Sequence, residues 1–354
     1  MQNVPITTPQ SASVSSQPIV KRQAKPNDEM QAVLDQLSSL CGKPIEQLSP
    51  QQARLQPTPA DAVKALLARQ HKNTAPESLA KVENKFIAGA AGQIAIRIYT
   101  PTGTGPFPVV LYIHGGGWVI ADINTYDSSP RALANAAKAI VVSTHYRQAP
   151  EHPFPASHDD VFAAYQWVLE NAASFNGDPH RVAVAGESAG GNMAAAISLT
   201  ARQRKVPLPL HQVLVYPVSG TDINTPSFLE NAKAKPLNKA MMVWFAKHEF
   251  KNATDPHDHR IDLVAADLSG MPPTTLITAE IDPLRSAGKT LAEKLKASGV
   301  EVEYKNYEGV THEFFGMGAV LSESREATQL AAANLSKAFA HKIDSRQAAR
   351  SKAA

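Results

Sequence analysis

The sequence contains a single cysteine, Cys41, among its 354 residues. An intrachain disulfide is therefore impossible, which fits a reducing compartment, and we expect a cytoplasmic protein. Cys41 itself is expected to be a small, buried or half-buried side chain. No apolar run approaches the roughly 20 residues of a membrane-spanning helix, so we expect no integral membrane segment. Residues 1–26 lack a basic stretch followed by an apolar one and do not resemble a signal peptide.

An excess of charge of one sign is also missing. The chain has 35 Lys and Arg residues against 32 Asp and Glu residues, a net charge of +3. Because no run of basic residues forms a stripe either, we expect no nucleic-acid partner. Hydrophobic residues make up 43% of the chain and charged residues 19%, which is ordinary for a globular protein. The length allows one large domain with an appendage.

Short apolar segments alternate with longer helical ones over most of the chain. Eight strands are expected, at residues 86–88, 94–99, 109–113, 140–144, 182–185, 213–216, 275–279 and 302–307. Helices are expected at residues 129–138, 157–173, 189–204, 284–297 and 323–340. Near-continuous apolar strands between helices are typical of a mostly parallel sheet buried on both faces. We therefore expect an α/β fold with an eight-stranded, mostly parallel sheet and helices on both faces.

Two further segments interrupt this alternation. Apolar residues recur at helical spacing from about residue 27, and a polar, helix-prone insertion follows residue 218. The insertion leaves the sheet at the carboxyl ends of its strands, where ligands bind in α/β proteins. We therefore expect a helical cap from residues 27–82 and 219–252, over a core of residues 83–218 and 253–345. Residues 1–26 and 346–354 are expected to be disordered tails.

A candidate nucleophile, Ser188, lies in the sequence Gly-Glu-Ser-Ala-Gly at residues 186–190. This Gly-x-Ser-x-Gly pattern occurs once, directly after an expected strand and directly before an expected helix. Such a context exposes the serine hydroxyl on a sharp strand-to-helix turn, where flanking glycines relieve crowding. The helix N-terminus also favours negative charge that develops at this point. The alternative is a glycine-rich turn that only packs the helix onto the sheet.

A second glycine-rich segment, His-Gly-Gly-Gly-Trp at residues 114–118, ends the third expected strand. The tetrahedral intermediate of acyl transfer carries an oxyanion that needs fixed hydrogen-bond donors. The backbone N–H groups of Gly115 and Gly116 suit this role because no side chain blocks their approach. The N–H of Ala189, next to the candidate nucleophile, is the expected third donor. Three glycines alone are more often a flexible turn, so the prediction depends on their pairing with residues 186–190.

Ser188 needs a general base, and the base needs an orienting carboxylate. The chain order nucleophile, acid, base is typical of a serine on such a strand-to-helix turn. His312 lies in a loop just after the last expected strand, at the same end of the sheet as the serine. Asp282 also follows a strand at that end, and we favour it over its neighbour Glu280. Asp267 precedes that strand and therefore belongs to the opposite end.

These motifs resemble the hormone-sensitive-lipase-like family of α/β-hydrolases, the bacterial family IV esterases. The similarity spans about residues 27–341 and rests on residues 114–118, 146–156, 186–192, 282–285 and 312–314. The resemblance implies a catalytic triad of Ser188, Asp282 and His312, with oxyanion donors at Gly115, Gly116 and Ala189. It also implies an α/β-hydrolase fold with a helical cap, no cofactor or metal, and hydrolysis of small, short to medium acyl esters. Many members of the family are homodimers.

The chain departs from the usual pattern of this family at several points. Glu187 stands where Asp is common, directly before the nucleophile. Ser286 and Ala287 replace a frequent acidic pair, which is expected to loosen the loop of the catalytic acid. Gln148 stands where the family has leucine, and Ile-Asp-Leu at residues 261–263 stands where Ser-Pro-Leu is frequent.

Two expectations concern side chains around the site. Arg147 and Glu151 are expected to form a buried or half-buried ion pair with a structural role. Trp118, Met242 and Phe245 are candidates to line the acyl pocket, although each is explained at least as well as an ordinary core residue.

Three alternatives stay open at this point. The sequence His-Asp-His at residues 257–259 could bind a metal, but its spacing is unfavourable and a third ligand is not evident, so a solvated loop is expected. An amide hydrolase would use the same three catalytic residues as an esterase. A non-catalytic receptor, as in plant hormone receptors that resemble this family, would have lost the base, whereas His312 is present.

Overall fold

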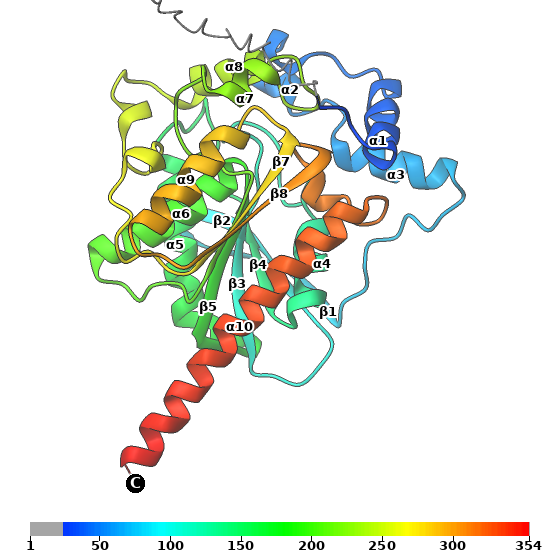
Figure 1. Ribbon diagram of the computed structural model, residues 1–354. Coiled ribbons are helices and arrows are strands. Elements are labelled where there is room, and N and C mark those ends of the chain that lie inside the picture. Colours follow the sequence, from blue (N-terminus) through cyan, green and yellow to red (C-terminus); the bar gives the residue numbers. More distant parts are fainter. Residues whose placement is uncertain (1–23, 354) are drawn as a thin grey trace, which may run out of the picture.

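The computed structural model describes the backbone of residues 24–353 and the side chains of residues 24–340. Its strands form one eight-stranded sheet in the order β1-β2-β4-β3-β5-β6-β7-β8. Their bounds are Lys81–Gly89 (β1), Gly92–Thr100 (β2), Phe107–Ile113 (β3), Ile140–Thr144 (β4), Gly177–Glu187 (β5), Gln212–Val215 (β6), Thr274–Ile281 (β7) and Val302–Thr311 (β8). The pairs β1–β2 and β2–β4 are antiparallel and the other pairs are parallel. The predicted eight-stranded, mostly parallel sheet is confirmed (Figure 1).

The central strands are buried along almost their whole length. Every residue of β4 and β6 is buried, and β3 and β7 each have a single partly exposed residue. The edge strand β1 is exposed or partly exposed everywhere except at Ile87. Burial without alternation is what a parallel sheet covered on both faces requires, which explains the near-continuous apolar runs in the sequence.

Helices alternate with the strands from β3 to β8, as the sequence predicted. The α-helices are Asp28–Ser39 (α1), Pro50–Ala53 (α2), Pro59–Arg69 (α3), Ser128–Ala137 (α4), Ala156–Asn171 (α5), Ala189–Arg204 (α6), Pro226–Glu230 (α7), Lys239–Glu249 (α8), Arg285–Ala297 (α9) and Ser322–Ala353 (α10). Short 3₁₀ helices are Ile45–Gln47 (η1), Ala172–Phe175 (η2), Asp255–His257 (η3), Leu263–Ala265 (η4) and Phe314–Gly316 (η5).

Apolar side chains pack into two clusters, one on each face of the sheet. Along β3, Val109, Leu111 and Ile113 belong to the first cluster, and Val110 and Tyr112 belong to the second. This is the two-residue alternation of a strand. Helices α5, α6 and α9 contribute to the first cluster, and α1, α3, α4 and α10 contribute to the second. The prediction of helices on both faces is therefore confirmed (Figure 1).

The N-terminal segment and the insertion after β6 meet over one end of the sheet. Helix α8 of the insertion contacts η1, and the indole Nε1 of Trp244 donates to the carbonyl of Leu48 at 3.2 Å. In Figure 1, α2, α7 and α8 lie together at this end. These contacts agree with a two-piece cap, while the exact division of the chain into cap and core stays a prediction.

Some expectations at the ends of elements need revision or fall outside the described residues. The prediction for Cys41 is wrong, because its side chain is exposed. Cys41 has a positive φ of 55° in the turn after α1, where the apolar stripe of that helix has ended. Helix α10 continues to Ala353, past residue 340 where the sequence predicted its end. The predicted tails at residues 1–26 and 346–354 lie mostly outside the residues whose side chains are described.

Within residues 24–353, none of the helices combines the length and the apolar character that a bilayer span requires.

Candidate active site

Ser188 occupies a strained turn between β5 and α6. Its backbone has φ 57° and ψ −120°, a region that side-chain-bearing residues rarely adopt and that costs on the order of 1–3 kcal/mol. Flanking glycines make this turn possible. A Cβ on Gly186 would collide with the carbonyl of Gly190, and a Cβ on Gly190 would collide with the carbonyl of Ile113. The local sequence therefore forces the Ser188 side chain out of the sheet at the end of β5.

The two partners predicted for Ser188 come from the ends of β7 and β8. His312 follows β8, and its Nε2 lies 2.9 Å from the Oγ of Ser188. Asp282 follows β7, and its Oδ2 lies 2.7 Å from the Nδ1 of His312. The other oxygen of Asp282 accepts a hydrogen bond from the backbone N–H of Leu284 at 2.8 Å, which fixes the carboxylate. All three side chains are at least 94% buried, with exposures of 6% for Ser188, 3% for His312 and 0% for Asp282.

The environment of His312 favours the protonated imidazole. Burial is the largest single influence and lowers the pKa of His312, but the charge and hydrogen bond of Asp282 raise it, with help from Glu313 and Glu187. The sum leaves the pKa of His312 above its ordinary value. An imidazolium formed when His312 takes a proton is therefore stabilised in place.

The rejected carboxylates occupy other positions. The Oε2 atom of Glu280 accepts the backbone N–H of Gly309 at 2.8 Å, so Glu280 supports the last part of β8, which leads to His312. Asp267 lies 3.2 Å from Arg202 with an exposed side chain. Neither carboxylate contacts the imidazole, whereas Asp282 does.

The predicted oxyanion donors lie on a firmly held loop. Among the described residues, none accepts a hydrogen bond from the backbone N–H of Gly115, Gly116 or Ala189. The carbonyl of Gly115 contacts the Nδ1 of His114 at 2.8 Å and accepts the hydroxyl of Tyr146 at 3.0 Å. Because carbonyl and N–H of one trans peptide point in opposite directions, these bonds also set the direction of the Gly116 N–H.

A buried histidine completes the support of this loop. Burial, with the neighbouring His145, lowers the pKa of His114 to about 3, so its ring is neutral. Since the carbonyl of Gly115 can only accept, Nδ1 of His114 carries the hydrogen. Its Nε2 then accepts from Nδ1 of His145, 3.0 Å away. His114 thus acts on the loop through its tautomer rather than through charge.

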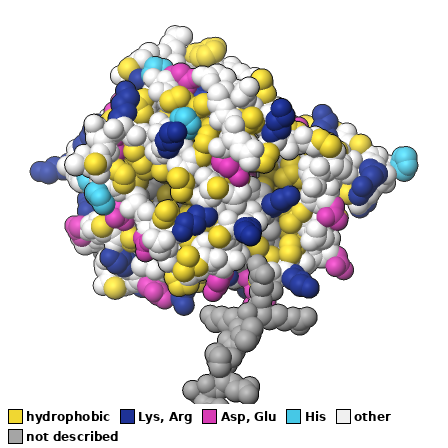
Figure 2. Space-filling view, turned by 90° about the horizontal axis from the view of Figure 1, so that it is seen from above, with side chains coloured by type: hydrophobic (Ala, Val, Ile, Leu, Met, Phe, Trp, Pro, Cys, Tyr) yellow, Lys and Arg dark blue, Asp and Glu magenta, His cyan; other side chains and the backbone are white. Residues whose placement is uncertain are grey.

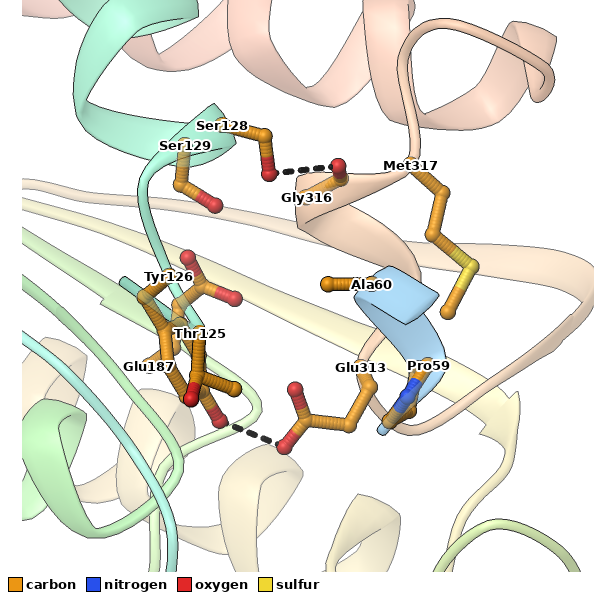
Figure 3. A pocket seen from close by; sticks show the side chains of 10 residues that line it. All are labelled: Pro59, Ala60, Thr125, Tyr126, Ser128, Ser129, Glu187, Glu313, Gly316 and Met317. Carbon is orange, nitrogen blue, oxygen red and sulfur yellow. Dashed lines mark hydrogen bonds between the residues drawn. The ribbon is translucent and has the colours of Figure 1, made fainter. Parts of the chain in front are cut away.

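Two further carboxyls beside the triad were not assigned a role from the sequence. Glu187 is buried, and its carboxylate accepts the hydroxyls of Tyr112 and Tyr216. Glu313, directly after the base, accepts the hydroxyl of Tyr126 at 2.5 Å. Burial raises the pKa of Glu187 to about 7 and also raises the pKa of Glu313. Both line a small pocket between the starts of α3 and α4 and the helix η5 (Figure 3).

The loop of Asp282 was expected to be loosened, but hydrogen bonds to residues 227 and 231 support it. The hydroxyl of Ser286 accepts the backbone N–H of Ser227 at 3.1 Å, and the hydroxyl of Ser227 accepts the N–H of Ser286 at 2.9 Å. The Ser227 hydroxyl also donates to the carbonyl of Pro283, and Asn231 donates to the carbonyl of Asp282. Helix α7 and the residue that follows it therefore support this loop with neutral groups.

The predicted ion pair between Arg147 and Glu151 is wrong. Arg147 pairs with Asp160 of α5 at 2.7 Å, and Glu151 pairs with Arg54 of the N-terminal segment, also at 2.7 Å. Each charge therefore pairs with a residue outside residues 147–151, because the packing of α5 and of the N-terminal segment decides which side chains meet. Gln148 donates to the carbonyls that follow the oxyanion loop, at residues 120 and 121.

The remaining candidates divide between core and surface. Trp118 and Phe245 are buried in the first apolar cluster, and Met242 packs against it while partly exposed. In the loop at residues 257–259, His257 is exposed and His259 contacts Gln203 at 3.0 Å. Within the described part of the chain, no group of three or more His, Cys, Asp and Glu side chains converges as a metal site.

Comparisons with known proteins agree with this geometry. A model of the family described as alpha/beta hydrolase fold matches residues 110–316. The carboxylesterase NlhH of Mycobacterium tuberculosis is 41% identical over 296 residues, covering 80% of this chain and 91% of the relative. A hyperthermophilic esterase of the archaeon Pyrobaculum calidifontis superposes with a TM-score of 0.80 at 34% identity, covering 88% of this chain and 98% of the other. EstE1, a thermostable carboxylesterase from a metagenomic library, has a TM-score of 0.77 at 37% identity, covering 83% and 98%.

The match to the family extends over more than half of the chain, and the relatives are covered almost in full. The chain therefore belongs to the α/β-hydrolase fold family, among its hormone-sensitive-lipase-like, family IV esterases.

Proposed function

We propose that the protein is a serine carboxylesterase that hydrolyses short to medium acyl esters through an acyl-enzyme. The observation that carries the proposal is the chain of contacts from Ser188 through His312 to Asp282, at 2.9 Å and 2.7 Å, on a strained strand-to-helix turn. These are the distances at which a base removes a hydroxyl proton and a carboxylate orients the base.

The first half of the reaction acylates Ser188. His312 Nε2 takes the hydroxyl proton as Oγ attacks the ester carbonyl carbon, and the carbonyl oxygen becomes an oxyanion. The backbone N–H groups of Gly115, Gly116 and Ala189 receive this oxyanion, each contributing roughly 10²–10³ in kcat. The imidazolium then gives its proton to the departing alkoxide as the ester C–O bond breaks. The alcohol leaves, and the acyl group stays on Oγ.

The second half uses the same groups on water. His312 takes a proton from water as the water oxygen attacks the acyl carbon, and the oxyanion returns to the same three donors. The proton then passes to Oγ of Ser188 as the acyl bond breaks, which releases the carboxylic acid. Throughout, Asp282 keeps the hydrogen on Nδ1 so that Nε2 faces the serine. Every step runs on the chain's own residues and water.

The cap is proposed to limit the acyl chain. Phe245 of α8 lies against Gly117, so closely that a Cβ on that glycine would meet the aromatic ring. A side chain of the insertion therefore stands directly over the oxyanion loop, which favours short to medium acyl groups. Seen from above, apolar side chains are interspersed with Lys and Arg over this face (Figure 2). Because apolar side chains do not form a continuous patch on this face, it is suited to a small dissolved ester rather than to a large apolar binding partner.

A fluorophosphonate probe tests the proposal directly. We expect it to label the wild-type chain at Ser188 and to leave the Ser188→Ala variant unlabelled. A p-nitrophenyl ester series from acetate to palmitate should peak at short or medium chains, and the matched anilides should react far more slowly. Labelling that persists in Ser188→Ala would remove the assignment, and faster cleavage of the anilides would make the protein an amidase.

Location and assembly complete the proposal. We propose a cytoplasmic homodimer that needs no nucleic-acid or membrane partner. Cell fractionation tests the location, and sedimentation velocity of the purified chain tests the dimer. A monomer across the micromolar range, or a membrane-bound fraction, would contradict these two points without affecting the esterase assignment.

A further inference from the structure

Glu187 and Glu313 place two carboxyls behind the catalytic base, from different parts of the chain. Glu187 ends β5 and is 1% exposed, and Glu313 is half-buried directly after His312. In Figure 3 both side chains reach into one pocket, with Tyr126 between them. The esterase mechanism described above assigns neither of them a step. Their position beside the triad therefore needs an explanation of its own.

Tyrosine hydroxyls from three elements hold the two carboxyls. Tyr112 of β3 and Tyr216, just after β6, both donate to Glu187. Tyr126, just before α4, donates to Glu313 at 2.5 Å. The ring of Tyr216 also lies against the imidazole of His312, with ring centroids 4.4 Å apart. A continuous set of contacts thus runs from the buried carboxyl to the catalytic base.

The charges around this cluster do not balance if every carboxyl is ionised. Asp282, Glu187 and Glu313 would place three negative charges around the single imidazole of His312. Among the described residues, no Arg or Lys forms an ion pair with any of these carboxylates. An uncompensated buried charge is costly, and the protein avoids that cost by keeping a proton. The pKa of Glu187 near 7 and the raised pKa of Glu313 agree with a proton that is kept within this cluster.

We propose that Glu187 and Glu313 are positioning residues that act on His312 as one carboxyl pair sharing a single proton. The pair carries one negative charge at neutral pH, and this charge stabilises the His312 imidazolium that forms in both halves of the reaction. The inference rests on the proposed esterase function for its catalytic part. The shared proton is a property of the folded chain and does not depend on that function.

The groups facing the pair define what must be controlled. They are the hydroxyls of Ser129, Tyr112, Tyr126 and Tyr216, the imidazole of His312 and the carboxylate of Asp282. Replacing one glutamate by glutamine keeps one carboxyl, which loses its like-charged neighbour and ionises. A single variant should therefore keep the net charge of the pair, and only the double variant removes it. This distinguishes an electrostatic role from a simple contribution of each side chain to packing.

The pH dependence of kcat/KM for a p-nitrophenyl ester is the first test. In the Glu187→Gln/Glu313→Gln double variant, the acid limb should move to lower pH by roughly one unit, because His312 loses a nearby negative charge. The plateau kcat should fall several-fold while KM changes little. In each single glutamine variant, the acid limb of the kcat/KM profile should stay at the wild-type pH. The Glu187→Asp variant should also leave the acid limb at this pH. Glu308→Gln, at an exposed position on β8, is the matched control with an unchanged profile.

Infrared spectroscopy of the protonated carboxyl band is the second test and needs no activity. At pH 6.5 the difference between wild type and Glu187→Gln should contain one protonated carboxyl. The band of the buried Glu249 should cancel in this difference, and Glu249→Gln identifies it. This readout also serves if the double variant fails to fold.

Three outcomes would overturn the inference. The first is an active double variant whose acid limb has not moved, and the second is a difference spectrum with no protonated carboxyl. The third is a wild-type pH profile that shifts with added K⁺, Mg²⁺ or Ca²⁺, since a bound cation would then balance the charge. If every variant and the wild type lack esterase activity, the proposed function fails instead, and the infrared result alone decides on the proton.

Discussion

The guanidinium of Arg54 donates from its Nε to the carbonyl of Val119 at 2.8 Å, across 65 residues of sequence. The same guanidinium donates to the carbonyl of Ala149 and forms a two-pronged pair with Glu151. Val119 follows the three glycines of the oxyanion loop by two positions. The N-terminal segment is therefore tied directly to the backbone that carries the proposed oxyanion donors, and Phe245 of the insertion packs on the same loop.

Replacing Arg54 by methionine should slow the reaction without removing any reacting group. The aliphatic stem stays, but the loop loses its hydrogen bond at Val119, and small displacements of oxyanion donors are costly in rate. We expect Arg54→Met to lower kcat roughly ten-fold with little change in KM, measured with a short-chain ester. Arg69→Met, at an exposed position on α3, is the control. Equal effects of the two substitutions would show that the Val119 contact is not what matters.

Ser188→Ala should lose activity on the order of 10⁶ in kcat, because the remaining groups have no nucleophile to activate. The fold should be kept, since a smaller side chain fits the same turn. Circular dichroism and a thermal melt check the fold, and active-site titration excludes contaminating esterase. Activity within two orders of magnitude of the wild type would mean that another residue attacks the ester.

Asp282→Asn should lower kcat by roughly 10⁴, because an amide no longer keeps the hydrogen on Nδ1 of His312. Glu280→Gln tests the competing acid at almost the same place in the chain. Its side-chain oxygen can still accept the N–H of Gly309, so only a small loss is expected. A larger loss for Glu280→Gln than for Asp282→Asn would reverse the choice of acid.

Gly117→Ala should destabilise the protein for two separable reasons. Gly117 has a φ of 57°, which costs alanine about 1–2 kcal/mol, and the new methyl group would also meet the ring of Phe245. Phe245→Ala in the same chain removes the second cost but not the first. In a double-mutant cycle measured by urea unfolding, Gly117→Ala should therefore lower the free energy of unfolding less in the Phe245→Ala background than in the wild type. Strictly additive effects would mean that ring and loop do not touch in solution.

Stability should depend on pH through Glu249, which is fully buried and whose Oε2 has no hydrogen-bond partner among the described residues. Burial raises the pKa of Glu249 well above its ordinary value, so the folded chain keeps this proton where the unfolded chain loses it. The protonated Glu249 contributes fully to stability at pH values below its pKa in the unfolded chain. This contribution is lost as the pH rises through its pKa in the folded chain. Glu249→Gln should therefore match the wild type near pH 5 and exceed it at pH 8 in urea unfolding. Glu326→Gln, at an exposed position, should leave the pH dependence unchanged.

The sequence by itself determined the strands, the helices and the residues expected at the site. Buried parallel strands must be apolar along their length, so the central strands are visible as short runs in the chain. A serine on a strand-to-helix turn requires glycines at fixed spacing, which made Ser188 visible from five residues. The acid and base could be placed because residues that follow parallel strands meet at one edge of the sheet. Asp282 and His312 lie there, and their catalytic roles stay predictions.

Only the tertiary structure decided which charged side chains form ion pairs and which carboxyls are buried without a basic partner. Arg147 and Glu151 are close in sequence, yet they pair with Asp160 and Arg54, because packing of distant segments sets the distance between side chains. Glu187 appeared to be a minor variation of a motif. Its place in one pocket with Glu313, beside the hydroxyls of three tyrosines, depends on strands and loops that no local pattern connects. Burial by those elements, and not residue type, is what raises the pKa of both carboxyls.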